Sequence, residues 1–173
     1  MTAEREESLT APLLVRVDNR LVHGQVLEAW VPALEVSALW IADDEAAGDE
    51  LAQMAMGLAI PPRVSLEVMT VAQAALRLGP SGKGAPKRTL LLVREVQGAS
   101  QLAAAGVSIP RLNLGNVHFR AGRKQVAPTL YLDAAELEAL EAFAGAGTEI
   151  EWRAVPADSP LTLAQLQAKH AAI

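Results

Sequence analysis

Near its start the chain reads Leu13-Leu-Val-Arg-Val-Asp-Asn-Arg-Leu-Val-His-Gly-Gln-Val26. Residues 13–18 form a mainly apolar run that is typical of a buried strand, and a helix-like run begins at Gln25. The loop between the two runs carries His23, with two arginines and an aspartate in the seven residues before it. Open α/β sheets bind ligands at the carboxyl ends of their strands. This stretch therefore predicts a strand, a loop and a helix, with a site at the histidine.

Short β-like runs alternate with longer helix-like segments along the rest of the chain, which indicates a mainly parallel α/β sheet. We expect strands at residues 13–18, 38–42, 64–70, 89–93, 111–114, 129–132 and 149–155. We expect helices at residues 25–34, 45–60, 71–78, 96–105, 134–144 and 163–172. Residues 115–128 break the alternation as an irregular or hairpin excursion. The prediction is one α/β domain, residues 12–173, with a predominantly parallel twisted sheet of about seven strands and helices on both faces, after a flexible leader at residues 1–11.

Two local signals support the expected helix ends. Pro61-Pro62 should end the second helix, because proline lacks an amide proton and disfavours helix in the residue before it. Asp133 followed by Glu136 resembles a capping box at the start of the fifth helix.

Composition excludes several classes of function. The 173 residues contain no cysteine, which rules out disulfides, thiol nucleophiles and cysteine metal sites and fits a reducing cytoplasm. A net charge of -5 argues against a protein that wraps nucleic acid with a basic surface. The sequence has no apolar stretch of roughly 18 residues, and its N-terminus is polar where a signal peptide would be apolar. We therefore expect a soluble, cytoplasmic protein whose anion sites are local.

The residues around His23 suit a histidine that carries a phosphoryl group. A carboxylate such as Asp18 can accept a hydrogen bond from one ring nitrogen, which leaves the other nitrogen unprotonated and nucleophilic. Arg20 or Arg16 could pair with phosphate oxygens, Gly24 permits close backbone approach, and a helix N-terminus favours an anion. The alternative is that His23 caps the helix beside an ordinary ion pair between Asp18 and Arg20. From chemistry alone the two interpretations are equally supported.

The remaining candidates carry weaker signals. His118 could line the same cleft but is better interpreted as an exposed loop residue, and His170 suits the last turn of a helix. Residues 79–84 lack the spacing of a phosphate-binding P-loop, and the acidic residues 43–45 are more typical of helix capping than of cation binding. No metal or nucleotide cofactor is expected.

Arg120, Arg123 and Lys124 form a basic cluster in an otherwise acidic chain. The cluster is either a solvated loop or a surface that completes an anion site or faces an acidic partner.

The quoted stretch resembles a known family, the mannose/sorbose-class enzyme IIB subunits of the bacterial phosphotransferase system (PTS). The family's signature runs close to Arg-Ile-Asp-Asp-Arg-Leu-Ile-His-Gly-Gln-Val, and residues 16–26 differ from it only at Val17, Asn19 and Val22. Residues 43–47, 59–64 and 119–126 are similar to further family segments, so the likeness runs from about residue 13 to about residue 167.

The resemblance implies a phosphotransferase with a covalent phosphohistidine. In that family the histidine that matches His23 accepts phosphate from the phosphohistidine of enzyme IIA and passes it to a sugar during uptake. By residue-to-residue match we expect Arg20 and Asp18 to act with His23. The remaining expected phosphate-binding residues are Arg16, Gly24, Gln25 and Arg120.

The implied partners are phosphorylated enzyme IIA and the membrane components IIC and IID with bound sugar. Membrane contact would occur only through these partners, nucleic acid is not expected, and a homo-oligomer is allowed. A different hypothesis is a regulatory phosphohistidine protein that is not coupled to sugar transport, and a third is a non-catalytic binding module. One departure stands out: the chain has Asn113-Leu-Gly-Asn116 where the family often has Asn-Val-Gly-Gly. Asn116 thus adds a side chain where backbone flexibility matters, which could alter partner docking or the route of the sugar.

Overall fold

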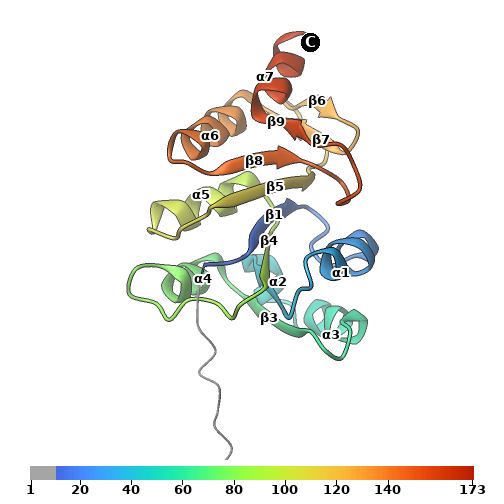
Figure 1. Cartoon of the computed structure of the whole chain (residues 1–173), viewed down its shortest axis with the longest axis vertical. Coiled ribbons are helices and arrows are strands. Elements are labelled where there is room, and N and C mark those ends of the chain that lie inside the picture. Colours follow the sequence, from blue (N-terminus) through green and yellow to red (C-terminus); the bar gives the residue numbers. More distant parts are fainter. Residues whose placement is uncertain (1–10) are drawn as a thin grey trace, which may run out of the picture.

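The computed structural model describes residues 11–173, so the expected leader at residues 1–11 lies outside the described residues apart from Ala11. The main sheet contains seven strands: β1 (Leu14–Asp18), β2 (Ala38–Ala42), β3 (Ser65–Met69), β4 (Thr89–Val93), β5 (Arg111–Asn116), β8 (Glu149–Trp152) and β9 (Leu161–Thr162). Their order is β3-β2-β4-β1-β5-β8-β9, and every pairing is parallel except that of β9 with β8 (Figure 1). The predicted single α/β domain with a mostly parallel sheet is confirmed.

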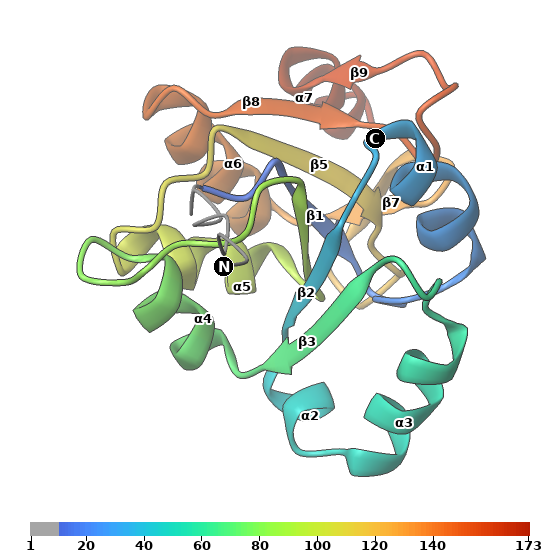
Figure 2. The same ribbon diagram turned by 60° about the horizontal axis from the view of Figure 1, so that its bottom comes forward.

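Helices cover both faces of the sheet (Figures 1 and 2). One face is covered by α4 (Val71–Leu78), α5 (Val96–Ala104) and α6 (Ala134–Gly145), with α7 (Leu163–Ala171) beside β9. The other face is covered by a π-helical segment η1 (Val26–Trp30), α1 (Val31–Ala33), α2 (Asp44–Ala47) and α3 (Glu50–Ala59). Buried residues form one apolar cluster on each face, because both faces of a parallel sheet must be shielded from water.

Alternation along β1 decides which face carries the site. Val15 and Val17 point into the cluster under α5 and α6, and Leu14 points into the cluster under η1. Successive side chains of a strand point to opposite faces. Arg16 and Asp18 therefore lie on the η1 face, at the carboxyl end of the sheet.

The expected strand at residues 129–132 does not belong to the main sheet. β7 (Leu130–Leu132) pairs with β6 (Lys124–Ala127) in a separate antiparallel hairpin, so the excursion after β5 is the hairpin alternative. The seventh strand of the main sheet is β9, which sequence analysis missed because it is two residues long.

The expected helix at residues 45–60 is two helices. Gly48 ends α2, and Asp49 begins α3 by accepting a hydrogen bond from the Ala52 amide at 2.9 Å. α3 stops at Ala59, ahead of the two prolines as predicted. The capping box of α6 is also confirmed, with Glu136 N donating to Asp133 Oδ1 at 2.8 Å and Asp133 N to Glu136 Oε2 at 2.9 Å. Within residues 11–173, none of the helices has the length and apolar character needed to cross a membrane.

Candidate functional site

The site begins with an irregularity between β1 and β5. The register shifts between Val17 and Asp18, so that Asp18 lies opposite Asn116 and Gly115 is passed over. A Cβ atom built on Gly115 would lie 2.2 Å from Arg16 Cζ. Glycine is therefore required at this bulge, because the Arg16 guanidinium occupies the space of a side chain.

Asp18 is the centre of the site and is fully buried. Its Oδ2 accepts hydrogen bonds from His23 Nε2 at 2.7 Å, Asn116 Nδ2 at 2.8 Å, and Arg16 Nη2 at 3.0 Å and Nε at 3.2 Å. Its Oδ1 accepts the backbone amide of Arg20 at 3.0 Å. Burial by itself raises the pKa of Asp18, but the hydrogen bond from His23 and the charge of Arg16 help to hold that pKa below its ordinary value. Asp18 is therefore an ionised acceptor.

Arg16 supports Asp18 from below and is also fully buried. Besides the two bonds to Asp18, it donates to Asn113 Oδ1 at 2.5 Å and to the carbonyl oxygens of Arg153 and Ala154 at 3.0 and 3.1 Å. All five N–H groups of a guanidinium are thereby used. This placement differs from the expected phosphate contact of Arg16, because no N–H group is left for a phosphate.

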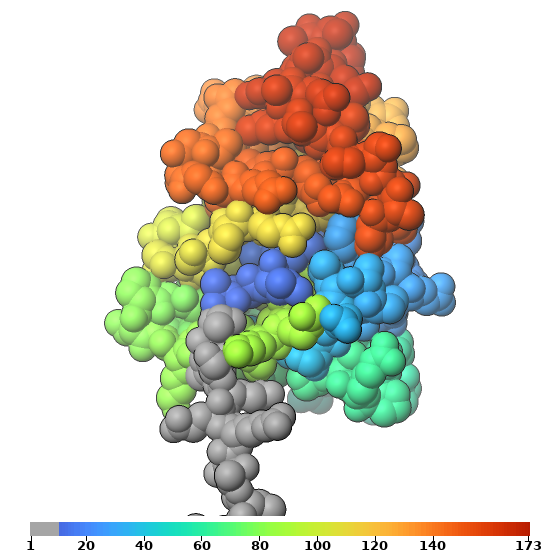
Figure 3. Space-filling view, viewed as in Figure 1, coloured from blue at the N-terminus to red at the C-terminus, as the bar shows by residue number. Residues whose placement is uncertain are grey.

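The segment after the loop closes over Arg16. Trp30 stacks on the guanidinium with 5.0 Å from Cζ to the ring centroid, and its Nε1 donates to Ala154 O at 2.9 Å. Figure 3 shows this blue segment packed against the orange-red chain that follows β8. The expected regular helix at residues 25–34 widens into η1, because Pro32 lacks the amide that would donate back into the helix.

His23 directs one ring nitrogen, Nε2, to Asp18 and leaves the other, Nδ1, without a hydrogen-bond partner among residues 11–173. Because Asp18 is an ionised acceptor, the nitrogen that faces it, Nε2, must carry the proton. No residue from 11 to 173 forms a hydrogen bond with Nδ1, and 13% of the side chain is exposed. A Cβ atom built on the neighbouring Gly24 would meet nothing within 4 Å. In the neutral ring, Nδ1 is thus the nitrogen that carries the lone pair, and open space lies beside the next residue, Gly24.

The loop holds His23 through a constrained backbone. Leu21 has φ of 56°, a left-handed conformation that side chains other than glycine adopt at a cost. Its side chain is buried in the cluster under η1, and its amide donates to Asp18 O at 3.0 Å. Burial of the leucine compensates for the backbone strain and fixes the turn from Asp18 to His23.

Arg20 and Gln25 form the rim of the site. Arg20 Nη2 donates to Gln25 Oε1 at 2.8 Å, and Arg20 Nε lies 3.9 Å from Asp18 Oδ1. The Arg20 side chain is 40% exposed. In contrast to Arg16, this arginine retains N–H groups that can reach an anion.

Arg120 lies apart from this cluster. It lines a hollow of about 320 Å³ together with Glu95 and Asp133, whereas a hollow of about 380 Å³ beside Arg20 is lined by His118 and its neighbours. The structure thus does not place Arg120 with the other expected site residues. His118 borders the site as an exposed residue, as the sequence suggested.

The members of the basic cluster at residues 120–124 differ in environment, since Arg120 is exposed whereas Arg123 is buried. Arg123 is buried and forms ion pairs with Glu136 at 2.6 Å and Glu95 at 2.5 Å. Lys124 Nζ donates to the His170 carbonyl at 3.2 Å. Arg123 is therefore a structural residue. This corrects both interpretations made for it from the sequence, a solvated loop residue and part of an anion site or partner surface.

Sequence analysis missed Asn113 and Trp30, and it treated Asn116 only as a departure from the family. A signal for the two asparagines was present, because both interrupt an otherwise apolar strand. A buried polar side chain must find a partner, so such residues are expected at a site.

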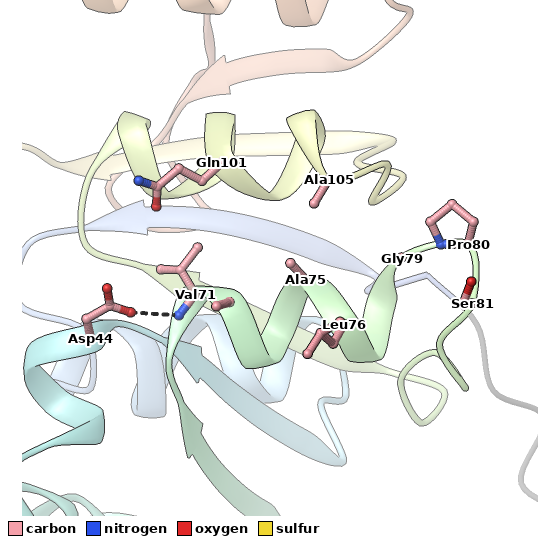
Figure 4. A pocket seen from close by; sticks show the side chains of 10 residues that line it. Asp44, Val71, Ala75, Leu76, Gly79, Pro80, Ser81, Gln101 and Ala105 are labelled. Carbon is pink, nitrogen blue, oxygen red and sulfur yellow. Dashed lines mark hydrogen bonds between the residues drawn. The ribbon is translucent and has the colours of Figure 1, made fainter.

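A larger groove lies elsewhere on the molecule, between α4 and α5 (Figure 4). It has a volume of about 690 Å³ and is mainly apolar. Asp44 lines it, but the carboxylate already accepts the Val71 amide at 2.9 Å. Across residues 11–173, no three His, Asp or Glu side chains gather in an arrangement suited to a metal ion.

The chain is similar to a known protein family over almost all of its described length. Residues 13–172 match a family described as the PTS system sorbose subfamily IIB component. The PTS mannose-specific EIIAB component of Escherichia coli K12 is 33% identical over 156 residues, which cover 90% of this chain and 48% of that protein. The chain thus spans about half the length of this curated relative.

Two solved structures share the fold. The N-acetylgalactosamine-specific IIB component 1 of E. coli superposes with a TM-score of 0.77 at 31% identity, covering 86% of this chain and 96% of that one. The IIB domain of the sorbose permease from Klebsiella pneumoniae gives a TM-score of 0.80 at 25% identity, covering 92% and 98%.

Proposed function

The chain belongs to the sorbose subfamily of PTS IIB components, and from this membership we propose that it is a phosphocarrier that acts through His23. His23 takes a phosphoryl group from the phosphohistidine of an enzyme IIA and passes it to a sugar held by membrane components IIC and IID. One observation carries the proposal: buried Asp18 holds Nε2 at 2.7 Å, while Nδ1 has no hydrogen-bond partner among residues 11–173 and can attack a phosphorus atom. We place this relay in the cytoplasm, the compartment that the composition predicts.

The first transfer is an in-line displacement at phosphorus. The Nδ1 lone pair of His23 attacks, the new Nδ1–P bond forms, and the N–P bond of the donor breaks with its electron pair returning to the donor imidazole. The His23 ring then carries a positive charge, since Nε2 keeps its proton. Asp18 faces that proton and stabilises the charge, as the carboxylate of a catalytic triad does.

Arg20 and Gln25 are the groups best placed to contact the phosphoryl oxygens. Arg20 is a half-exposed cation whose charge offsets the negative charge that spreads over those oxygens during transfer. Gly24 leaves space for the phosphoryl group, and Arg16 acts indirectly by holding Asp18.

The second transfer repeats the displacement with a sugar hydroxyl as nucleophile. An O–P bond forms, the Nδ1–P bond breaks, the hydroxyl proton is released and His23 returns to its neutral form. No metal or nucleotide takes part in this scheme, because the donor is itself a phosphoprotein.

The test is transfer of radioactive phosphate from phosphorylated enzyme IIA. We expect acid-labile, base-stable label on His23, attached at Nδ1 as identified by NMR, and no label on His23→Ala. The controls His118→Ala and His170→Ala should take up label like the unaltered protein. Label on another residue, or none, would refute the proposal.

A chase separates transport from regulation. Addition of membrane vesicles that contain IIC and IID, together with their sugar, should move the label from His23 to the sugar. Label that stays on the protein would favour the regulatory alternative.

A further inference from the structure

Asn116 is a buried residue whose side chain contacts two other members of the site. It ends β5, is 4% exposed, and its Nδ2 lies 2.8 Å from Asp18 Oδ2 and 3.4 Å from Gln25 Oε1. An amide nitrogen carries two protons, so it can donate to both oxygens. Asn116 therefore bridges the carboxylate under His23 and the amide at the rim.

The partners fix the orientation of both amides. The atom of Asn116 that faces the ionised Asp18 must be its nitrogen, because two oxygens would repel each other. The atom of Gln25 that faces Arg20 Nη2 at 2.8 Å must be its oxygen, because arginine only donates.

We propose that Asn116 is a positioning residue for phosphoryl transfer, which locks Asp18 toward Nε2 of His23 and turns the Gln25 NH₂ group toward the phosphoryl oxygens. This inference rests on the proposed function. With Gln25 Oε1 held by Arg20 and Asn116, the NH₂ group is on the opposite side of the carboxamide. It forms no hydrogen bond with any residue from 11 to 173, so it is a free donor at the rim of the site.

The strand register places Asn116 next to Asp18. The register shift after Val17 sets Asn116 directly opposite Asp18, while Gly115 leaves room for Arg16. Without the side chain, Asp18 loses one of the donors on Oδ2, and Gln25 loses one of its two. Gln25 can then rotate, and Asp18 is held by fewer donors, so the proton on the His23 ring is less firmly held at Nε2.

The central variant is Asn116→Leu, which keeps the size of the side chain and removes both donors. We expect kcat for transfer from phosphorylated enzyme IIA to fall about tenfold, the scale of one hydrogen bond to a charged group. The KM for enzyme IIA should change less than about twofold, because only 4% of Asn116 is exposed to a docked protein. ¹⁵N NMR of His23 should show a larger fraction of the Nδ1–H tautomer.

Two further variants separate positioning from packing. Asn116→Ser keeps a donor and should recover part of the lost kcat and of the Nε2–H tautomer. Thr129→Val is the matched control, since Thr129 Oγ1 donates to the oxygen of Gly115, the neighbour of Asn116 in β5, at 2.8 Å and forms no hydrogen bond with Asp18 or Gln25. It should leave the tautomer of His23 as it is.

An Asn116→Leu protein that is folded by circular dichroism, with kcat and tautomer both unchanged, would overturn the inference. If that variant does not fold, Asn116→Ser decides by the same two measurements. Failure of the unaltered protein to take label on His23 would instead refute the proposed function, so the two failures are distinguishable.

Discussion

Arg16 and Arg20 are four residues apart and take opposite roles. Arg16 belongs to a strand that is covered on both faces, so its charge must be neutralised within the protein, by Asp18 and by carbonyl oxygens. Arg20 follows the end of the strand and lies at the rim with 40% of its side chain exposed. The same residue type therefore supports the site in one place and remains available for an anion in the other.

Replacement of Arg20 by alanine tests this difference. We expect Arg20→Ala to slow phosphoryl transfer about 10–100-fold, because it removes a positive charge from the transition state. The free energy of unfolding should change by less than about 0.5 kcal/mol, as is usual for an exposed side chain. Rapid-quench measurements with phosphorylated enzyme IIA and urea denaturation check the two expectations.

Arg111→Ala is the control for loss of charge. Arg111 is also half-exposed and pairs with Glu149 at 4.0 Å, but it begins β5, at the opposite end of the sheet. Equal slowing by both variants would show that Arg20 acts only through net charge.

At the scale of elements, Arg123 attaches the β6–β7 hairpin to two helices. It pairs with Glu95, the residue that precedes α5, and with Glu136 in the first turn of α6, and it donates to the His118 carbonyl at 2.9 Å. His118 borders the hollow beside Arg20. The ion pairs thus hold one wall of the site in place.

Arg123→Met should lower the free energy of unfolding by about 3 kcal/mol, because two partly buried carboxylates lose their cation. Urea denaturation monitored by circular dichroism measures the change. Lys124→Met is the matched control, since Lys124 makes a single hydrogen bond to a carbonyl, and it should cost less than about 1 kcal/mol. Equal effects would contradict the structural role of Arg123.

At the scale of the whole molecule, buried carboxylates link stability to pH. Asp43 is mostly buried. Burial raises the pKa of its carboxyl group, but the hydrogen bonds from Arg94 and from the Ala46 amide together lower that pKa by more, so the net shift is downward. The pKa of Asp18 is lowered as well. Because both values lie below the ordinary value of 3.8, the unfolded chain takes up protons first as the pH falls.

The stabilisation from these two carboxylates should thus be complete above about pH 5 and decline as the pH drops below about 4. Urea denaturation at pH 7, 5, 4 and 3 should show this loss. Asp43→Asn keeps a side-chain oxygen that can cap α2 but removes the ion pair with Arg94, so its curve should be flatter below pH 4. Parallel curves for the two proteins would contradict the assignment to Asp43.

Much of the fold was predictable because its signals are local. Apolar runs predicted six of the seven strands of the main sheet, and Pro61-Pro62 and the Asp133–Glu136 box predicted helix ends. The break between α2 and α3 was missed, although Gly48 and Asp49 stand there, because the apolar pattern continues across them. β9 was missed because two residues carry no periodicity.

By itself, the sequence determined the α/β class, the family resemblance and the cluster of His23, Asp18 and Arg20, since these depend on neighbours along the chain. Only the tertiary structure decided that Arg16 is buried, that Nδ1 is the free nitrogen, and that Asn116 reaches Asp18 from 98 positions away. The physical reason is that hydrogen-bond partners of a buried charge are set by strand register and by the shift after Val17. Register depends on how distant strands pack together, and no spacing within one segment records it.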